Sequence, residues 1–392
     1  MLTKTEISGG LAVLVAAAGL RQERAAELRA LVARPEFSWS DVIGAAARHR
    51  MAGLVRARLA EADIASVETE PLVELARRDA ALNLRLAIEA ARLAERLSAM
   101  GVTPLLLKGP HQAQALYGDL ALRQCRDLDL LIPEARIEAV VARLESEGYR
   151  RLPPLDATVS LELWLRASKD VGLISPDGLM IELHARPHQN AFLSRRLDLW
   201  RDARPLGRHG LQPSREALYA YLCLHGASSG WFRLKWLADL LRLLPEDPAG
   251  LEALHQRARR RGAGAASGQA LLLLQSIFGV ELPPRLATTL HHSPRARLLE
   301  RLGRALVCSE LPVEQRPALH RLLALSQLLL CPHPAFLLEE ASRWLLDWRL
   351  VERLRLPRRW WRLYPLLRLP YLLLRAIAAV SRSQRKPASA RA

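Results

Sequence analysis

The spacing of apolar residues changes at Gly101, and this change restricts the folds open to the chain. Residues 1–100 place apolar side chains every three or four positions, which predicts several amphipathic helices, the longest from about Pro71 to Met100. The next run, Val102–Leu107, is continuous and apolar, as in a buried strand. Helical spacing returns at Ser214 and continues to about residue 380. The sequence therefore predicts an α+β fold in which a small sheet interrupts a mainly helical protein.

The chain is long enough for more than one packed unit. Its 392 residues exceed what one hydrophobic core usually accommodates, and a hydrophobic content of 50% indicates a globular protein. We predict four regions: an N-terminal helical region (1–100), an α/β core (101–205), a C-terminal helical domain (206–356) and a basic amphipathic tail (357–392).

A strand, a tight turn and a helix follow one another at the start of the core. The strand ends in Lys108-Gly109-Pro110, and a proline directly after a glycine suits the first turn of a helix, which we expect from His111 to Tyr117. Gly109 would let a phosphate approach the backbone, the helix N-terminus offers amide donors, and Lys108 adds a positive charge. A solvated lysine at a strand end is the alternative for Lys108.

Acidic residues follow on two further strands. Asp127 and Asp129 alternate with apolar residues, so both carboxylates point to one face of a strand that Pro133 ends. A Ser-Pro-Asp-Gly turn at 175–178 then joins two apolar runs into a hairpin. Its second strand places Glu182 and His184 on one face.

These carboxylates have the pattern of a site for divalent cations. Phosphoryl and nucleotidyl transfer use such ions to neutralise phosphate charge and to align the attacking and leaving oxygens. Mg²⁺ or Mn²⁺ suits carboxylate ligands, and two acids on one face repel unless a cation binds between them. We therefore expect Asp127, Asp129 and Glu182 to be metal ligands and catalytic residues, with an NTP as substrate. The alternatives are an exposed acidic pair neutralised by Arg123 and Arg126, and a solvated hairpin face for Glu182.

Two further polar residues belong to this pattern. Arg123 stands four residues before Asp127 and either contacts phosphate or fixes the aspartates, with a structural salt bridge as the alternative. His184 either orients Glu182 or contacts the substrate, and a structural histidine is equally consistent with the sequence.

Several segments resemble one known family. They are Leu105–Gly109, Leu116–Asp119, Arg123–Ile132 and Ile181–His184, with weaker similarity around Ala47–Arg50 and a helical match in Leu222–Ala227 and Trp231–Asp239. Over about residues 35–245 the chain resembles the bacterial uncharacterised nucleotidyltransferase family, a branch of the DNA polymerase beta-like nucleotidyltransferase superfamily. The resemblance implies a small mixed sheet embedded in helices and carrying a divalent-metal and NTP site. It places Asp127, Asp129 and Glu182 at the ligand positions.

The segment Trp231–Asp239 is open to two interpretations. It is either a helical wall over the nucleotide pocket, with Lys235 or Arg233 contacting phosphate, or a packed aromatic core with a buried polar anchor. We count Lys235 among the candidate nucleotide-binding residues, and the others are Lys108, Gly109, Arg123 and His184.

The positive charge of the chain does not by itself indicate nucleic-acid binding. The formal net charge is +17, but the basic residues are scattered, only five of the 57 are lysines, and no nucleic-acid-binding motif accompanies them. The four cysteines are far apart and lack zinc-ligand spacing, as in a reduced cytoplasmic protein. We expect no nucleic-acid partner.

The C-terminal segment 358–375 interleaves arginine with tryptophan, tyrosine and leucine. This pattern is typical of a helix at a membrane surface or of a partner-docking helix, and docking on the protein's own body is the alternative. No stretch reaches the ~20 apolar residues that span a bilayer. We therefore expect a cytoplasmic protein, either free or peripheral at the inner membrane through this segment.

Two functional hypotheses follow. The first is an enzyme that transfers a nucleoside monophosphate from an NTP to a hydroxyl of a small molecule or peptide. The second is a non-catalytic nucleotide-binding or scaffold protein of a biosynthetic or membrane-associated assembly. The acceptor cannot be read from the motifs, because acceptor pockets are built by elements outside them.

Overall fold

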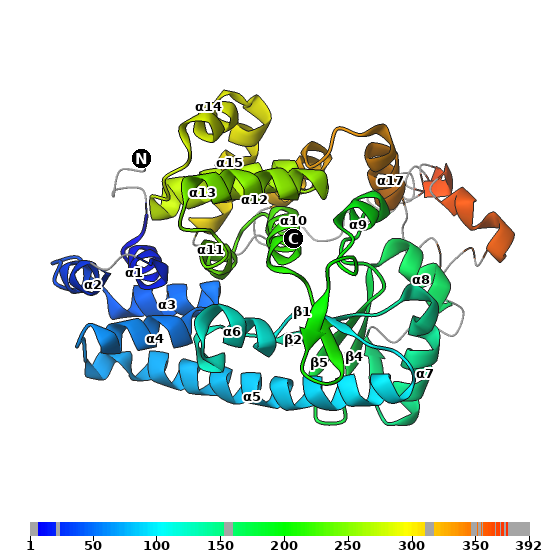
Figure 1. The fold of residues 1–392 in the computed structure, drawn as a ribbon, viewed down its shortest axis with the longest axis horizontal. Coiled ribbons are helices and arrows are strands. Elements are labelled where there is room, and N and C mark those ends of the chain that lie inside the picture. Colours follow the sequence, from blue (N-terminus) through cyan, green and yellow to red (C-terminus); the bar gives the residue numbers. More distant parts are fainter. Residues whose placement is uncertain are drawn as a thin grey trace, which may run out of the picture.

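The computed structural model describes residues 7–20, 24–152, 160–309 and 317–345, together with single positions and short runs between 351 and 374. A seven-stranded mixed sheet lies among helices from both ends of the chain (Figure 1). The predicted fold class, α+β with a small sheet embedded in a mainly helical protein, is confirmed.

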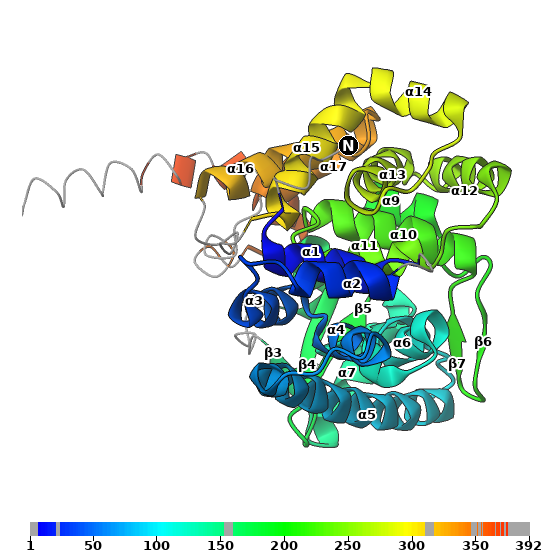
Figure 2. The same cartoon turned by 90° about the vertical axis from the view of Figure 1, so that its left-hand side faces the viewer.

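The N-terminal helices support the sheet from below and from one side. They are α1 (Gly9–Ala18), α2 (Arg24–Val32), α3 (Trp39–His49), α4 (Ala52–Glu61) and α5 (Glu70–Ala99). The 30-residue α5 has a proline in its first turn and buries one apolar face, as its helical spacing predicted. Figure 1 shows α5 running beneath the sheet, and Figure 2 shows α1–α4 stacked between α5 and the C-terminal helices.

The sheet places the predicted motif strands side by side at its centre. Its order is β3-β4-β5-β2-β1-β7-β6. The bounds are β1 (Leu105–Lys108), β2 (Asp127–Leu131), β3 (Arg150–Leu152), β4 (Asp170–Ile174), β5 (Met180–His184), β6 (Arg204–Leu206) and β7 (Gly210–Gln212). The central strand β2 pairs antiparallel with β1 and parallel with β5. Each of the three therefore brings its polar residues to one region of the sheet.

The two faces of the sheet belong to different hydrophobic cores. Leu106 and Leu130 pack with the second half of α5 and with helices that follow β2, whereas Leu105, Leu107 and Leu131 pack with N- and C-terminal helices. This division follows from the two-residue pleat of a strand. The helices between the strands are α6 (Pro110–Tyr117), α7 (Ile137–Ser146), α8 (Leu161–Ala167) and α9 (Ala191–Leu197).

The C-terminal helices cover the sheet from above in Figure 1. They are α10 (Arg215–Ser228), α11 (Leu234–Leu241), α12 (Pro248–Arg260), α13 (Gly264–Phe278), α14 (Pro284–His292), α15 (Pro294–Val307), α16 (Pro317–Ser326) and α17 (Pro334–Leu345). The sheet itself runs past the boundary that we predicted at residue 205, because β7 pairs in parallel with β1, Leu105 opposite Leu211.

Part of the predicted basic tail lies against the body of the protein. Tyr364 is buried in a small cluster with Leu163 of α8 and Val351, and Arg358 Nη2 lies 2.8 Å from Glu162 Oε1. Residues 375–392 of that tail lie outside the described residues. Within the described part of the chain, no helix is both long enough and apolar enough to cross a membrane.

Candidate active site

Strand pairing brings the predicted carboxylates together. In the parallel pair of β2 and β5, Asp129 stands opposite Glu182, and in the antiparallel pair of β1 and β2 it stands opposite Lys108. Asp127 lies two residues before Asp129 on β2, so both point to the same face of the sheet. Three carboxylates and one lysine from three strands thus face one region.

Asp129 is the most constrained of these residues. It is 1% exposed, and its Oδ1 lies 3.3 Å from Lys108 Nζ and 2.9 Å from His184 Nε2. Burial would raise the pKa of Asp129, but the charge of Lys108 and the hydrogen bond with His184 outweigh burial and hold that pKa well below its ordinary value. The other oxygen, Oδ2, is buried and has no hydrogen-bond partner among the described residues. One oxygen of an ionised carboxylate is therefore free to bind a cation.

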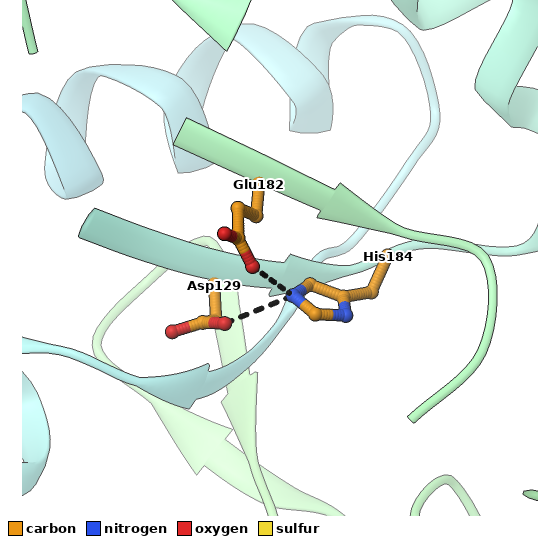
Figure 3. Close-up of side chains that lie close together, drawn as sticks. All are labelled: Asp129, Glu182 and His184. Atoms are coloured by element: carbon orange, nitrogen blue, oxygen red, sulfur yellow. Dashed lines mark hydrogen bonds and ion pairs between the residues drawn. The ribbon is translucent and has the colours of Figure 1, made fainter. Parts of the chain in front are cut away.

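His184 is held in one tautomer by Lys169. Figure 3 shows the imidazole of His184 beside its two carboxylate neighbours, Asp129 and Glu182. Lys169 Nζ lies 3.3 Å from His184 Nδ1 and 2.7 Å from Asp170 Oδ2. Burial would lower the pKa of Lys169, but Asp170 outweighs burial and raises it, so Lys169 is protonated. An ammonium group only donates hydrogen bonds, so Nδ1 accepts and Nε2 carries the hydrogen.

This tautomer makes His184 a positioning residue for the carboxylates. Asp129, Glu182 and His184 each offer one atom within 4.8 Å of the others, which is close enough for a shared metal ion. However, the hydrogen on Nε2 points to Asp129 Oδ1 at 2.9 Å, with Glu182 Oε2 at 3.3 Å. Because that nitrogen donates, His184 orients the carboxylates and leaves metal binding to their oxygens.

Asp127 completes the acidic cluster. It has no hydrogen-bond or ion-pair partner among the described residues, and it lines the same cavity as Asp129 and Glu182. Burial and the charges of Asp129 and Glu182 raise the pKa of Asp127. A divalent cation would relieve this repulsion, and carboxylate oxygens are the ligands that Mg²⁺ and Mn²⁺ prefer. The donor set Asp127, Asp129 and Glu182 therefore fits such an ion.

The acidic cluster opens into a cavity of about 520 Å³. This volume falls in the range of small-molecule sites. Seven basic side chains line the cavity, and they are Arg50, Lys108, Arg123, Lys169, Arg233, Lys235 and Arg343. Aromatic and hydroxyl side chains line it as well, and they are Phe232, Trp236, Phe336, Trp344, Ser228 and Ser229. The cavity is suited to a ligand that carries several negative charges.

Gly109 stands where β1 turns into α6, at the wall of the cavity. Its φ of 130° lies in the region that residues with a side chain avoid. Lys108 lines the cavity too, although its ammonium group is already close to Asp129, 3.3 Å from Oδ1.

Arg123 forms a buried ion pair with Asp239 of α11. Its Nε lies 2.9 Å from Asp239 Oδ1 and its Nη2 lies 2.9 Å from Oδ2, and the two side chains are 3% and 0% exposed. Tyr117 donates a further hydrogen bond to Asp239 Oδ1 at 2.8 Å. Arg123 therefore forms the structural salt bridge that was given above, from the sequence, as the alternative to a phosphate contact. The residue also lines the cavity.

Lys235 also reaches the cavity from α11. Its Nζ donates to the backbone oxygen of Gln124 at 2.8 Å, in the loop before β2. Burial, followed by the positive charge of Arg123, lowers the pKa of Lys235 to about 7. Lys235 therefore lies close to its protonation midpoint at neutral pH.

This shifted pKa predicts a pH-dependent contribution to stability. Between pH 7 and the ordinary pKa of 10.5 the unfolded chain holds a proton on Lys235 that the folded chain has released, so the free energy of unfolding rises with pH in this window. We expect the native protein to gain up to about 1 kcal/mol per pH unit relative to Lys235→Met over this range. Urea unfolding of both proteins at pH 7, 8 and 9 measures their free energies of unfolding. A difference between the two free energies that stays constant with pH would contradict the prediction.

Three residues that shape the site were not predicted from the sequence. Lys169 and Asp170 precede and begin β4, and Asp170 pairs with His184 in the ladder of β4 and β5. Asn83 of α5 donates to the Arg123 oxygen at 2.8 Å and accepts from the Cys125 amide at 2.9 Å, which fixes the loop before β2. Lys169 and Asp170 could have been identified only if the hairpin of β4 and β5 had been known to lie beside β2. No local signal pointed to Asn83.

Acidic residues on neighbouring strands of the mixed sheet face a cavity that is lined with basic side chains. The model of the uncharacterised nucleotidyltransferase family matches residues 35–279, and the chain belongs to that family. The predicted resemblance to an uncharacterised nucleotidyltransferase family is confirmed, and the match extends beyond residue 245 to the end of α13. No curated protein and no solved structure matches the chain.

Proposed function

We propose that this protein transfers a nucleoside monophosphate from an NTP to a hydroxyl of a small molecule or peptide. The observation that carries the proposal is Asp129, which is ionised and buried, with one oxygen held by Lys108 and His184 and the other without a partner among the described residues. Membership of a nucleotidyltransferase family supports the reaction class.

In this proposal Asp127, Asp129 and Glu182 hold Mg²⁺ or Mn²⁺. When bound, the ion neutralises phosphate charge and lowers the pKa of the attacking hydroxyl. Lys169 fixes the tautomer of His184, and His184 together with Lys108 keeps Asp129 oriented and ionised. Gly109 and the first turn of α6 offer a wall that phosphate can approach closely.

The reaction breaks one bond and forms another at the α-phosphorus. The hydroxyl oxygen of the acceptor attacks the α-phosphorus, and the bond from that phosphorus to the bridging oxygen breaks. The electron pair of the broken bond leaves with pyrophosphate, and the hydroxyl proton passes to a carboxylate of the cluster. The basic side chains of the cavity stabilise charge that moves onto the leaving pyrophosphate.

A labelling experiment tests the proposal. The purified chain is incubated with each α-³²P-labelled NTP and Mg²⁺ or Mn²⁺, in the presence of an extract of host-cell metabolites and peptides. Label on an acceptor, absent when EDTA is added, would support nucleotidyl transfer. Calorimetric binding of the NTP with no transfer of label would instead favour the non-catalytic nucleotide-binding alternative.

A further inference from the structure

The basic residues that line the cavity differ in their partners. Four of them lie within ion-pair distance of carboxylates: Lys108 with Asp129, Arg123 with Asp239, Lys169 with Asp170, and Arg343 with Glu340. Arg50 makes no side-chain hydrogen bond or ion pair with any of the described residues, and it is partly buried at the cavity wall. A half-buried guanidinium without a counter-ion is unfavourable in the free protein.

Arg50 also has an unusual backbone. It caps the C-terminus of α3 with φ 57° and ψ 51°, in the left-handed region. Glycine or asparagine is the usual residue at such a helix end, because a larger side chain is strained there. Backbone strain of this kind is found at ligand sites, where the surrounding structure enforces it.

The structure around Arg50 brings two distant segments together. His49 is buried and its Nδ1 accepts a hydrogen bond from the backbone amide of Leu234 at 3.0 Å. Arg233 Nη1 donates to the backbone oxygen of Arg48 at 2.8 Å. The end of α3 is therefore joined to the start of α11, which places Arg50 beside Arg233 and Lys235 at the same cavity.

Electrostatic coupling agrees with this placement. Burial, followed by the positive charges of Arg233 and Arg126, lowers the pKa of Arg50 to about 10, while the carboxylates of Asp127 and Asp79 oppose the shift. Arg50 is therefore surrounded by more positive than negative charge. An anion bound beside the acidic cluster would relieve the repulsion among these cations.

We infer that Arg50, Arg233 and Lys235 form the subsite for the β- and γ-phosphates of the NTP, and hence for the pyrophosphate that leaves. These two phosphates carry most of the negative charge of a triphosphate, and they leave as one unit when the α-phosphorus is attacked. Arg50 is the residue on which the subsite depends most, because its planar fork suits phosphate oxygens and no other described group uses it. This inference rests on the proposed function.

Pyrophosphate binding tests the subsite directly. Calorimetry with Mg²⁺ and inorganic pyrophosphate compares the native protein with Arg50→Gln, Arg50→Lys and the control Arg301→Gln, whose arginine is exposed on α15 away from the cavity. We expect Arg50→Gln to bind pyrophosphate about 10- to 100-fold more weakly. Arg50→Lys keeps the charge without the fork and should lose less, and Arg301→Gln should bind as the native protein does.

Thermal melting separates this role from a structural one. Removing an unpaired half-buried charge should leave the melting temperature of free Arg50→Gln unchanged or higher, whereas loss of a structural arginine would lower it. Pyrophosphate affinity within about twofold of native for Arg50→Gln, or no pyrophosphate binding by the native protein, would overturn the subsite. If the native protein transfers label but Arg50→Gln binds pyrophosphate with unchanged affinity, the proposed subsite is wrong and the proposed enzymatic function still stands. If pyrophosphate binding depends on Arg50 but no label is transferred, the proposed subsite stands and the proposed enzymatic function is wrong.

Discussion

Asp239→Ala is expected to lower the free energy of unfolding by about 3–5 kcal/mol, the largest stability effect of any single substitution proposed for this protein. The carboxylate is fully buried and accepts hydrogen bonds from Arg123 at 2.9 Å and from Tyr117 at 2.8 Å. Its removal leaves a guanidinium that is 3% exposed without its counter-ion. Urea unfolding followed by circular dichroism measures the change.

A double variant is the matched control. Arg123→Met combined with Asp239→Leu removes both charges, so no unpaired ion remains in the core, and it should cost less than Asp239→Ala alone. A loss of about 1 kcal/mol or less for Asp239→Ala would mean that water or another group replaces the carboxylate, against the burial that the structure shows.

Asp129→Asn should reduce label transfer by about a thousandfold, the largest effect expected on activity. The substitution keeps the shape of the side chain but removes the charge that Lys108 and His184 stabilise and the free buried oxygen that a cation would bind. Mn²⁺ affinity, measured by calorimetry, should fall together with activity. Because both quantities depend on the same oxygen, a loss of activity with unchanged Mn²⁺ affinity would contradict the assigned role.

Asp177→Asn is the control for this prediction. Asp177 lies in the turn between β4 and β5, its side chain is 65% exposed, and its only ion-pair contact among the described residues is with Arg92 at 3.9 Å. It should keep native activity and metal affinity, since exposed pairs contribute little. Transfer by Asp129→Asn within about tenfold of the native rate would place the metal ligands elsewhere in the chain.

The elements that rest on local pattern could be predicted from the sequence. The 30-residue helix α5, the strand–turn–helix unit at Lys108-Gly109-Pro110 and the hairpin of β4 and β5 all follow from apolar spacing and turn residues. The three-residue strands β3, β6 and β7 could not be predicted in this way, because they are too short for a period of two to be recognisable.

Some features of the candidate site could likewise be predicted from local sequence, whereas others depend on tertiary structure. That Asp127 and Asp129 share one face is a local consequence of the pleat, so the sequence determined it alone. Asp129 stands opposite Glu182 only because β2 pairs in parallel with β5. The tautomer of His184 is fixed only because Lys169 lies against its ring.

The sequence by itself determined which strand positions carry the acidic residues, because side-chain type and short-range alternation are properties of neighbouring positions. The tertiary structure decided which of them meet. Arg123 reaches Asp239 across 116 positions, and His49 reaches Leu234 across 185. Such contacts depend on how two hydrophobic cores and one sheet pack together, and no local pattern encodes a distance of that kind.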